Sequence, residues 1–169
     1  MSTASSVLVG SQGQTVWVKV EGRGSFQNSP GLKEFVHKMI QRGGRDFVVD
    51  LAACELMDST FMGTLAGVAL RLREIGQGRL RAIHVNPRNA SLLENLGLDQ
   101  LFEVEGGEGL KAPEALRETT GPVDAEKQRE VVLSAHEALV ETDSHNAVKF
   151  KDVIDYLRQE LNESGPGDA

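Results

Sequence analysis

Residues 47–65 read Phe-Val-Val-Asp-Leu-Ala-Ala-Cys-Glu-Leu-Met-Asp-Ser-Thr-Phe-Met-Gly-Thr-Leu. The first five are almost continuously apolar, which is typical of a short strand covered on both faces. A loop is predicted for residues 52–57. After it, Ser59 is placed to cap a long helix that reaches about Ile75, and Gly76 would end that helix. The stretch therefore predicts a strand, a loop and a helix, with small polar residues where the helix begins.

Strands and helices alternate on both sides of this stretch. Before it, residues 15–20 alternate as in a half-buried strand, and a helix is predicted from a cap at residue 28 or 29 to the Gly pair at 43–44. After it come a strand at 80–85, a helix that starts at Asn86-Pro87 and stops before Gly97, and a short strand at 101–104. This order predicts an α/β fold whose mixed or parallel sheet is connected by helical crossovers.

The remaining segments divide the chain. We expect a weakly ordered lead at 1–13, the α/β domain at 14–104, a linker at 105–122, a two-helix extension at 123–163 and a flexible tail at 164–169. The first extension helix is predicted to begin at a cap at Asp124, and the second near Asn146. Their apolar stripes need burial, either on the open face of the sheet or in a homodimer. The residues predicted to be buried are Val131, Val132, Ala135, Leu139, Phe150, Val153, Ile154, Leu157 and Leu161.

Composition narrows the functional classes. The chain of 169 residues carries a net charge of -7, and the acidic excess lies in residues 105–169. One Trp and one Tyr in an acidic chain argue against nucleic-acid binding. No apolar run approaches the roughly 18–20 residues that span a bilayer, and no signal peptide is visible, so we expect a cytoplasmic protein without a membrane partner. The single Cys54 forms no internal disulfide and fits a reducing compartment.

Met57-Asp-Ser-Thr60 with Gly63 is the distinctive motif, and three later segments support it. These are the strand at 80–85, the Asn-Pro-Arg helix start at 86–88, and Leu-Leu-Glu-Asn-Leu-Gly-Leu at 92–98. Together they resemble the STAS family, specifically the bacterial anti-sigma factor antagonists, over about residues 14–104. The resemblance implies a STAS-like mixed sheet of four to five strands with helices mainly on one side.

The resemblance also implies a function in transcription regulation and signal transduction. Antagonists of this family bind an anti-sigma factor that is also a serine kinase of the GHKL type, and so release the sigma factor. The kinase phosphorylates the serine that follows the motif Asp, which ends binding, and a PP2C-type phosphatase restores the competent form. On this chain the phosphoacceptor would be Ser59. The predicted partner-binding residues are Arg23, Ser25, Asp58, Ser59, Thr60, Phe61 and Met62.

Two positions depart from the family pattern. Phe61 stands where the family usually has Gly, and we expect an exposed or half-exposed ring that adds a hydrophobic anchor for the partner. The early segment 21–29 contains Arg23 where classical members have a Gly-Glu-Ile/Leu-Asp stretch, and it has no matching Asp. The resemblance gives residues 105–169 no role.

Physical reasoning supports a phosphate on Ser59. A serine at a helix N-cap lies beside unpaired backbone N–H groups, and these together with the helix dipole favour an anion. The fold would survive the modification, while a binding surface that already holds Asp58 would gain about 1.5 to 2 negative charges. A partner fitted to the neutral hydroxyl would then be repelled.

Other interpretations stay open beside this one. Ser59 could serve only as a helix cap, in a STAS scaffold or ligand-sensing module without a phospho-switch. An esterase built on Ser59 with His84 and Asp50 or Asp58 would lack the Gly-x-Ser-x-Gly elbow, so we expect no enzyme activity. The four His residues have no metal-ligand spacing with Cys54, and we expect neither a metal nor a cofactor.

Overall fold

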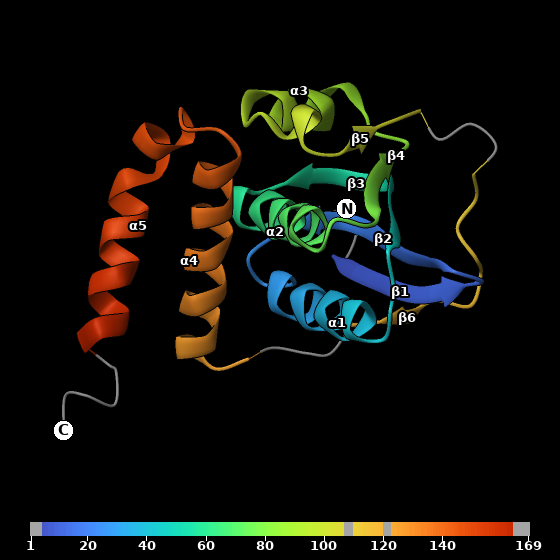
Figure 1. Ribbon diagram of the computed structural model, residues 1–169, viewed down its shortest axis with the longest axis horizontal. Helices are drawn as coiled ribbons and strands as arrows, with labels where there is room; N and C mark the ends of the chain where they lie inside the picture. The colour runs from blue at the N-terminus through green and yellow to red at the C-terminus, as the bar shows by residue number, and fades with distance from the viewer. Residues whose placement is uncertain (1–4, 107–109, 120–122, 164–169) are drawn as a thin grey trace.

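The computed structural model describes residues 5–106, 110–119 and 123–163. Its centre is a six-stranded mixed sheet with the order β5-β4-β3-β2-β1-β6 (Figure 1). β2, β3, β4 and β5 are mutually parallel, and β1 pairs antiparallel with both β2 and β6. The strands are β1 (Ser6–Gln12), β2 (Thr15–Gly24), β3 (Asp46–Met57), β4 (Arg79–Ile83), β5 (Glu103–Val104) and β6 (Arg117–Glu118).

The helices α1 and α2 connect the parallel strands and cover one face of this sheet (Figure 1). The alternation in β2 explains why: Val16, Val18 and Val20 enter the main core beneath these helices, whereas Trp17 enters a small cluster on the opposite face. The helical elements are α1 (Ser29–Gln41), α2 (Ser59–Ile75), α3 (Pro87–Asn95), the 3-10 helix η1 (Leu98–Gln100), α4 (Ala125–Thr142) and α5 (Asn146–Glu163). The predicted α/β class and STAS-like sheet are confirmed.

Local signals placed the C-terminal end of α2 and the starts of α3, α4 and α5 correctly. Gly76 ends α2 with a left-handed backbone at φ 84°, which glycine adopts without steric cost. Asn86 caps α3 by accepting a hydrogen bond from the backbone N–H of Asn89, and Asp124 caps α4 in the same way through Lys127. The predicted start of α5 at Asn146 is also confirmed.

Three stretches differ from the prediction. Residues 6–12 form β1 instead of a weakly ordered lead, because Val7 and Val9 are buried while the strand pairs with residues 15–21 of β2. The predicted loop at 52–57 continues β3, whose pairing with β2 extends through register shifts that follow Lys19 and Gly22. Residues 1–4 and the predicted tail at 164–169 lie outside the described residues.

The predicted linker is also partly structured. Residues 117–118 form β6 on the outer edge of β1. Leu110, Ala112 and Leu116 pack against Trp17, Val48 and Ile83 on the sheet face opposite α1 and α2. This face of the sheet is therefore covered by the chain that leads into the C-terminal helices.

The helices α4 and α5 form an antiparallel hairpin beside the helical layer (Figure 1). Its apolar stripe is buried within the same chain, against the helices α2 and α1 and not on the open face of the sheet. Val131, Ala135, Ala138 and Leu139 of α4 are buried, as are Ile154 and Leu157 of α5. Val153, which was predicted to be buried, is 40% exposed. Formation of a homodimer stays a prediction.

Candidate functional site: the surface around Ser59

The first turn of α2 is capped by Asp58. Its extended backbone (φ -89°, ψ 173°) precedes the helix, and its Oδ1 accepts a hydrogen bond of 2.8 Å from the N–H of Phe61. Its Oδ2 accepts a second hydrogen bond of 2.8 Å from the N–H of Phe26, in the loop between β2 and α1. The prediction that Ser59 is the cap is therefore wrong by one residue, because a carboxylate reaches the third N–H of the helix from position 58.

Ser59 is consequently the first residue of α2, and its hydroxyl is not used for capping. The Oγ atom lies 2.9 Å from Nε2 of His136 in α4. The other ring nitrogen, Nδ1, lies 2.7 Å from the carbonyl oxygen of Val132. A carbonyl only accepts, so Nδ1 of the neutral ring carries the proton, Nε2 accepts, and the Ser59 hydroxyl donates.

His136 is held rigidly in this position. Its side chain is 3% exposed, and its ring meets the ring of Phe150 edge-on with 4.9 Å between the centroids. Sequence reasoning missed this contact, because His136 lies 77 residues from Ser59 and had been assigned to the tail. The only local signal is that His136 directly follows Ala135 on the apolar stripe of a helix that had to be buried somewhere.

The three residues after Ser59 point into the protein. Thr60 and Met62 are 5% and 3% exposed, and Phe61 is fully buried. The expectation of an exposed Phe61 ring is wrong for a definable reason: Gly24 of β2 makes room for it. A Cβ atom at position 24 would lie 2.6 Å from Cδ1 of the ring. Phe61 is thus a core residue and offers no surface to a partner in this conformation.

Arg23 and Ser25 lie beside the start of α2. The N–H of Asp58 donates to the carbonyl of Gly24 over 2.8 Å, which joins the end of β2 to the helix start. The carbonyl of Arg23 accepts from the Asn28 side chain, and the N–H of Ser25 donates to the same side chain. The side chain of Arg23 is exposed and that of Ser25 is half-buried. Their roles in partner binding stay predictions.

The helix α4 lies across this same surface. Gln128 donates from Nε2 to the carbonyl of Phe26 in the loop between β2 and α1. Lys33 of α1 donates from Nζ to Oγ of Ser134 over 2.7 Å. Burial lowers the pKa of Lys33, and the positive charge of Lys127 lowers it further. Contacts from α4 therefore reach α1, the β2–α1 loop and the first turn of α2.

The residues proposed for an esterase do not assemble. His84 has a positive φ of 55°, and its Nε2 donates to the Leu110 carbonyl over 3.2 Å in a cleft of about 320 Å³. Asp50 lines the same cleft, and its carboxylate accepts from the N–H of Ala52. Ser59 is not among the residues that line it. The pairing of Ser59 with His84 that an esterase would need is therefore not formed, since the Ser59 hydroxyl faces His136 instead.

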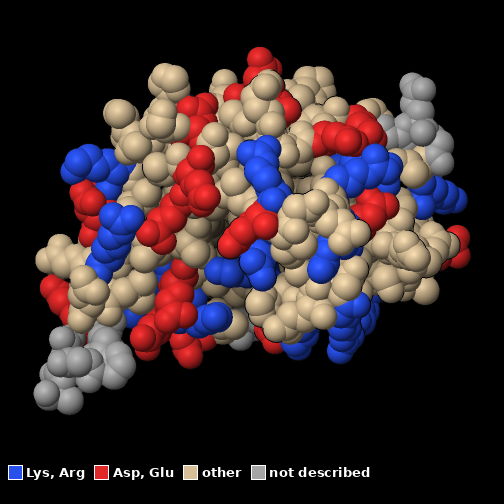
Figure 2. Space-filling view, in the orientation of Figure 1, with Lys and Arg blue, Asp and Glu red and all other residues tan. Residues whose placement is uncertain are grey.

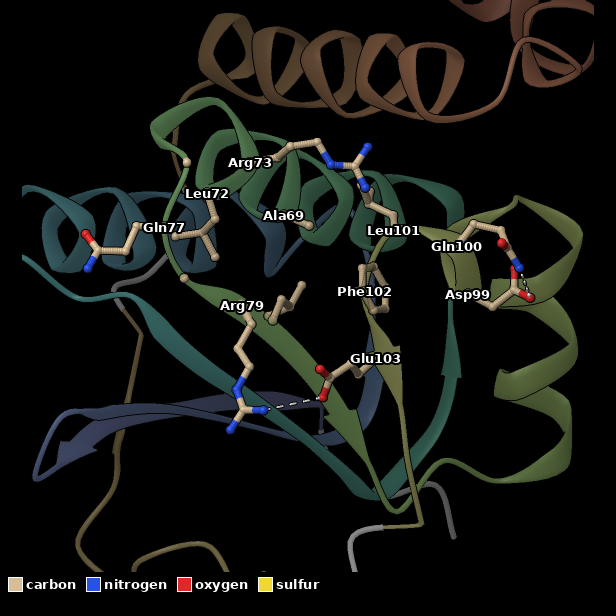
Figure 3. Close-up of a pocket in the computed structure, with 13 residues that line it drawn as sticks. Ala69, Leu72, Arg73, Gln77, Arg79, Asp99, Gln100, Leu101, Phe102 and Glu103 are labelled. Carbon is tan, nitrogen blue, oxygen red and sulfur yellow. Dashed lines mark hydrogen bonds and ion pairs between the residues drawn. The ribbon is translucent and has the colours of Figure 1, made fainter.

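A larger groove lies at the other end of α2. It encloses about 560 Å³ between the C-terminal end of α2, β4, η1 and β5, and Figure 3 shows its apolar floor around Leu72 and Phe102. Arg79 and Glu103 form an ion pair of 3.8 Å at its rim (Figure 3). None of the residues predicted for partner binding lines this groove.

Charge and metal-binding chemistry add little to the site. On the face shown in Figure 2, acidic and basic side chains are interspersed, without a broad basic patch among the described residues. Within residues 5–106, 110–119 and 123–163 no group of three or more His, Cys, Asp or Glu is arranged to hold a metal. None of the described helices is both long and apolar enough to cross a bilayer.

Comparison with known proteins assigns the fold to a family. A family model described as "Mlab, STAS domain" matches residues 7–104, and the chain belongs to the STAS domain family. The match includes β1, which the predicted domain start at residue 14 left out.

Individual relatives agree with this assignment. The anti-sigma-B factor antagonist of Staphylococcus aureus (strain NCTC 8325 / PS 47) is 34% identical over 90 residues, which are 53% of this chain and 82% of that protein. Among solved structures, an anti-sigma factor antagonist from Mycobacterium paratuberculosis superimposes with a TM-score of 0.54 at 21% identity, over 61% of this chain and 86% of that one. Unphosphorylated SpoIIAA, also an anti-sigma factor antagonist, gives 0.51 at 15% identity, over 64% and 90%. These two structures support the fold.

Proposed function

We propose that this protein is an anti-sigma factor antagonist whose binding surface is centred on Ser59. The observation that carries the proposal is the position of Ser59 as the first residue of α2, directly after the capping Asp58, within the segment that matches the STAS family. The relative at 34% identity carries the same functional name. The partner would be an anti-sigma factor, and the chain would regulate transcription by competitive binding in the cytoplasm.

We further propose that phosphorylation of Ser59 ends this binding. The first N–H groups of a helix have no intrahelical acceptor, and with the helix dipole they stabilise an anion at position 59. Asp58 is already committed to two backbone N–H groups, so its charge stays in place when the phosphate arrives. The patch would gain about 1.5 to 2 negative charges. The kinase would be the GHKL-type anti-sigma factor itself, and a PP2C-type phosphatase would reverse the step.

One observation favours the alternative of a STAS scaffold or ligand-sensing module. The hydroxyl of Ser59 already donates a hydrogen bond to His136, as a purely structural serine would. In that case position 59 would tolerate any small residue, and negative charge there would not alter the choice of partner.

Capture from lysates of the native cells separates the two functions. Full-length Ser59→Ala and Ser59→Asp are immobilised, and captured proteins are quantified by mass spectrometry. We expect Ser59→Ala to capture a serine-kinase anti-sigma factor at least about tenfold more than Ser59→Asp, since a repulsion of about 1.4 kcal/mol suffices for that ratio. Ser91→Ala and Ser91→Asp, at an exposed position of α3, are the matched controls. Equal capture by both Ser59 variants would refute the switch, and phosphopeptide analysis of the native protein checks the modification itself.

A further inference from the structure

The hairpin of α4 and α5 occupies the surface on which the proposed function depends. Three polar contacts define its footprint: His136 on Ser59, Gln128 on the Phe26 carbonyl, and Ser134 on Lys33. These contacts come from α2, from the β2–α1 loop and from α1. A partner that binds the hydroxyl of Ser59 together with this loop would collide with α4.

The contact between α4 and α2 is unusually close. A Cβ atom added to Gly63 would lie 2.3 Å from the carbonyl oxygen of Ala135 and 2.9 Å from its Cβ. The glycine therefore lets the backbones of the two helices approach without an intervening side chain. Ser59 lies four residues earlier on the same helix, so its hydroxyl faces α4 one turn away from this point.

The hairpin is fixed to the domain mainly through α4. Ala135, Ala138 and Leu139 are 3%, 8% and 0% exposed, whereas the outer face of α5 leaves Val148 85% and Tyr156 61% exposed. At the turn between the helices, Nδ2 of Asn146 donates to the carbonyls of Leu96 and Leu139. The domain thus holds one face of α4 and the turn, and the hairpin contributes no strand to the sheet.

A phosphate does not fit between Ser59 and His136 as they stand. The Oγ–Nε2 distance of 2.9 Å is a direct hydrogen bond. The ring of His136 also contacts the Val132 carbonyl through Nδ1 and packs edge-on against Phe150. Ser59 is half-buried, and with its side chain in the present orientation a phosphoryl group on Oγ competes with the imidazole for the space beside that oxygen. The imidazole cannot move away from Ser59 by itself, because it is buried and packed against α5.

We propose that the α4–α5 hairpin is an intramolecular cover of the Ser59 surface, and that it must leave before Ser59 is phosphorylated or the partner is bound. The inference rests on the proposed function for its biological meaning, but the cover is a property of this chain alone. The covered chain neither captures the partner nor accepts a phosphate. A signal that acts on the hairpin would therefore control both events at once.

The exclusion between the cover and a phosphate can be measured without any partner. The full chain carries Cys54→Ala, to remove the native thiol, and Ala138→Cys as a reporter on the inner face of α4. Phosphoserine is incorporated genetically at position 59 or, as the matched control, at the exposed position 91 of α3. The rate of labelling of the reporter by N-ethylmaleimide is compared with that of the unmodified chain.

We expect phosphoserine at position 59 to raise the labelling rate at least about fivefold, because the cover spends more time detached. Phosphoserine at position 91 should leave the rate unchanged. A smaller rise at position 59 overturns the proposal, since α4 would then accommodate the phosphate while docked. Amide hydrogen exchange, followed separately in β3 and in residues 125–163, guards against misfolding: faster exchange in β3 as well would assign the effect to unfolding and equally overturn it. Failure of the anti-sigma function would leave this outcome unaffected.

Discussion

At the scale of single residues, Asp58 has a structural role that its position in the motif did not indicate. Its two carboxylate oxygens accept hydrogen bonds from the N–H groups of Phe61 and Phe26, and so join the start of α2 to the β2–α1 loop. The substitution Asp58→Ala leaves both donors without their acceptor. The start of α2 at Ser59 is then less well defined.

We expect Asp58→Ala to lower the free energy of unfolding by about 1 to 2 kcal/mol, the usual effect of losing a helix cap. Urea denaturation followed by circular dichroism measures it. Asp152→Ala, on the exposed face of α5, is the control and should stay within about 0.5 kcal/mol of the wild type. If the two variants were equally stable, the capping role assigned to Asp58 would be wrong.

Cys54 gives a prediction about pH. Burial raises the pKa of its thiol, and hydrogen bonds from the backbone and from Asn89 only partly oppose this. The folded chain therefore keeps the thiol protonated to higher pH than the unfolded chain does. The stability from this group is complete below the ordinary thiol pKa and is lost as the pH rises from there through the raised pKa of the folded state. We expect Cys54 to react with iodoacetamide more slowly than a cysteine placed at exposed Ser91, because its thiol is buried and holds its proton. Mass spectrometry of both thiols at pH 8 checks it, and equal rates would contradict the burial that raises the pKa.

What the sequence could predict at this scale depended on distance along the chain. Ser59 was identifiable because its motif is local and its flanking strand and helix have clear patterns. His136 was not, because nothing in a helix of the extension indicates which surface it will meet. Phe61 misled for a related reason: its burial depends on Gly24, in a strand more than thirty residues earlier.

At the scale of elements, local features were again predictable from the sequence, and contacts between distant segments were not. Caps and terminators such as Asn86 and Gly76 act within one turn, so the helix ends were predictable. The strand β1 and the extension of β3 to Met57 were not, because both are stabilised by pairing with β2 and not by their own composition. The docking of α4 on α2 likewise depends on contacts between elements that are distant in the sequence. It can be tested by substituting two glycines of α2.

Gly63 and Gly67 lie one turn apart in α2, but of these two positions only Gly63 is in close contact with α4. Alanine at position 67 would meet nothing within 4 Å, whereas alanine at position 63 would collide with the backbone of Ala135. Both substitutions improve helix propensity by up to about 1 kcal/mol. We therefore expect Gly67→Ala to leave amide exchange in residues 125–163 unchanged, and Gly63→Ala to accelerate it while β3 stays protected. Equal protection of α4 in the two variants would show that the close approach is not needed for docking.

At the scale of the whole molecule, the chain combines a nearly neutral domain with an acidic C-terminal region. Residues 1–104 carry 11 basic and 10 acidic residues, and residues 105–169 carry 7 and 15. Detachment of the hairpin exposes the apolar face of α4 to water, so the covered state is favoured when no competitor is present. The fraction of open molecules then sets the apparent affinity for a partner, which is the intrinsic dissociation constant divided by that fraction.

Opening the cover should therefore strengthen partner binding without changing the partner surface. Ala135→Glu places a charge in the buried contact with Gly63, and Ala147→Glu places the same residue at an exposed position of α5. If one molecule in about ten is open, Ala135→Glu lowers the apparent dissociation constant for the captured anti-sigma factor by about tenfold. Ala147→Glu has no effect. Titration by isothermal calorimetry measures both. Removal of a competing cover can only improve the affinity of the surface that it covered. Weaker binding by Ala135→Glu would therefore place α4 within the partner interface instead.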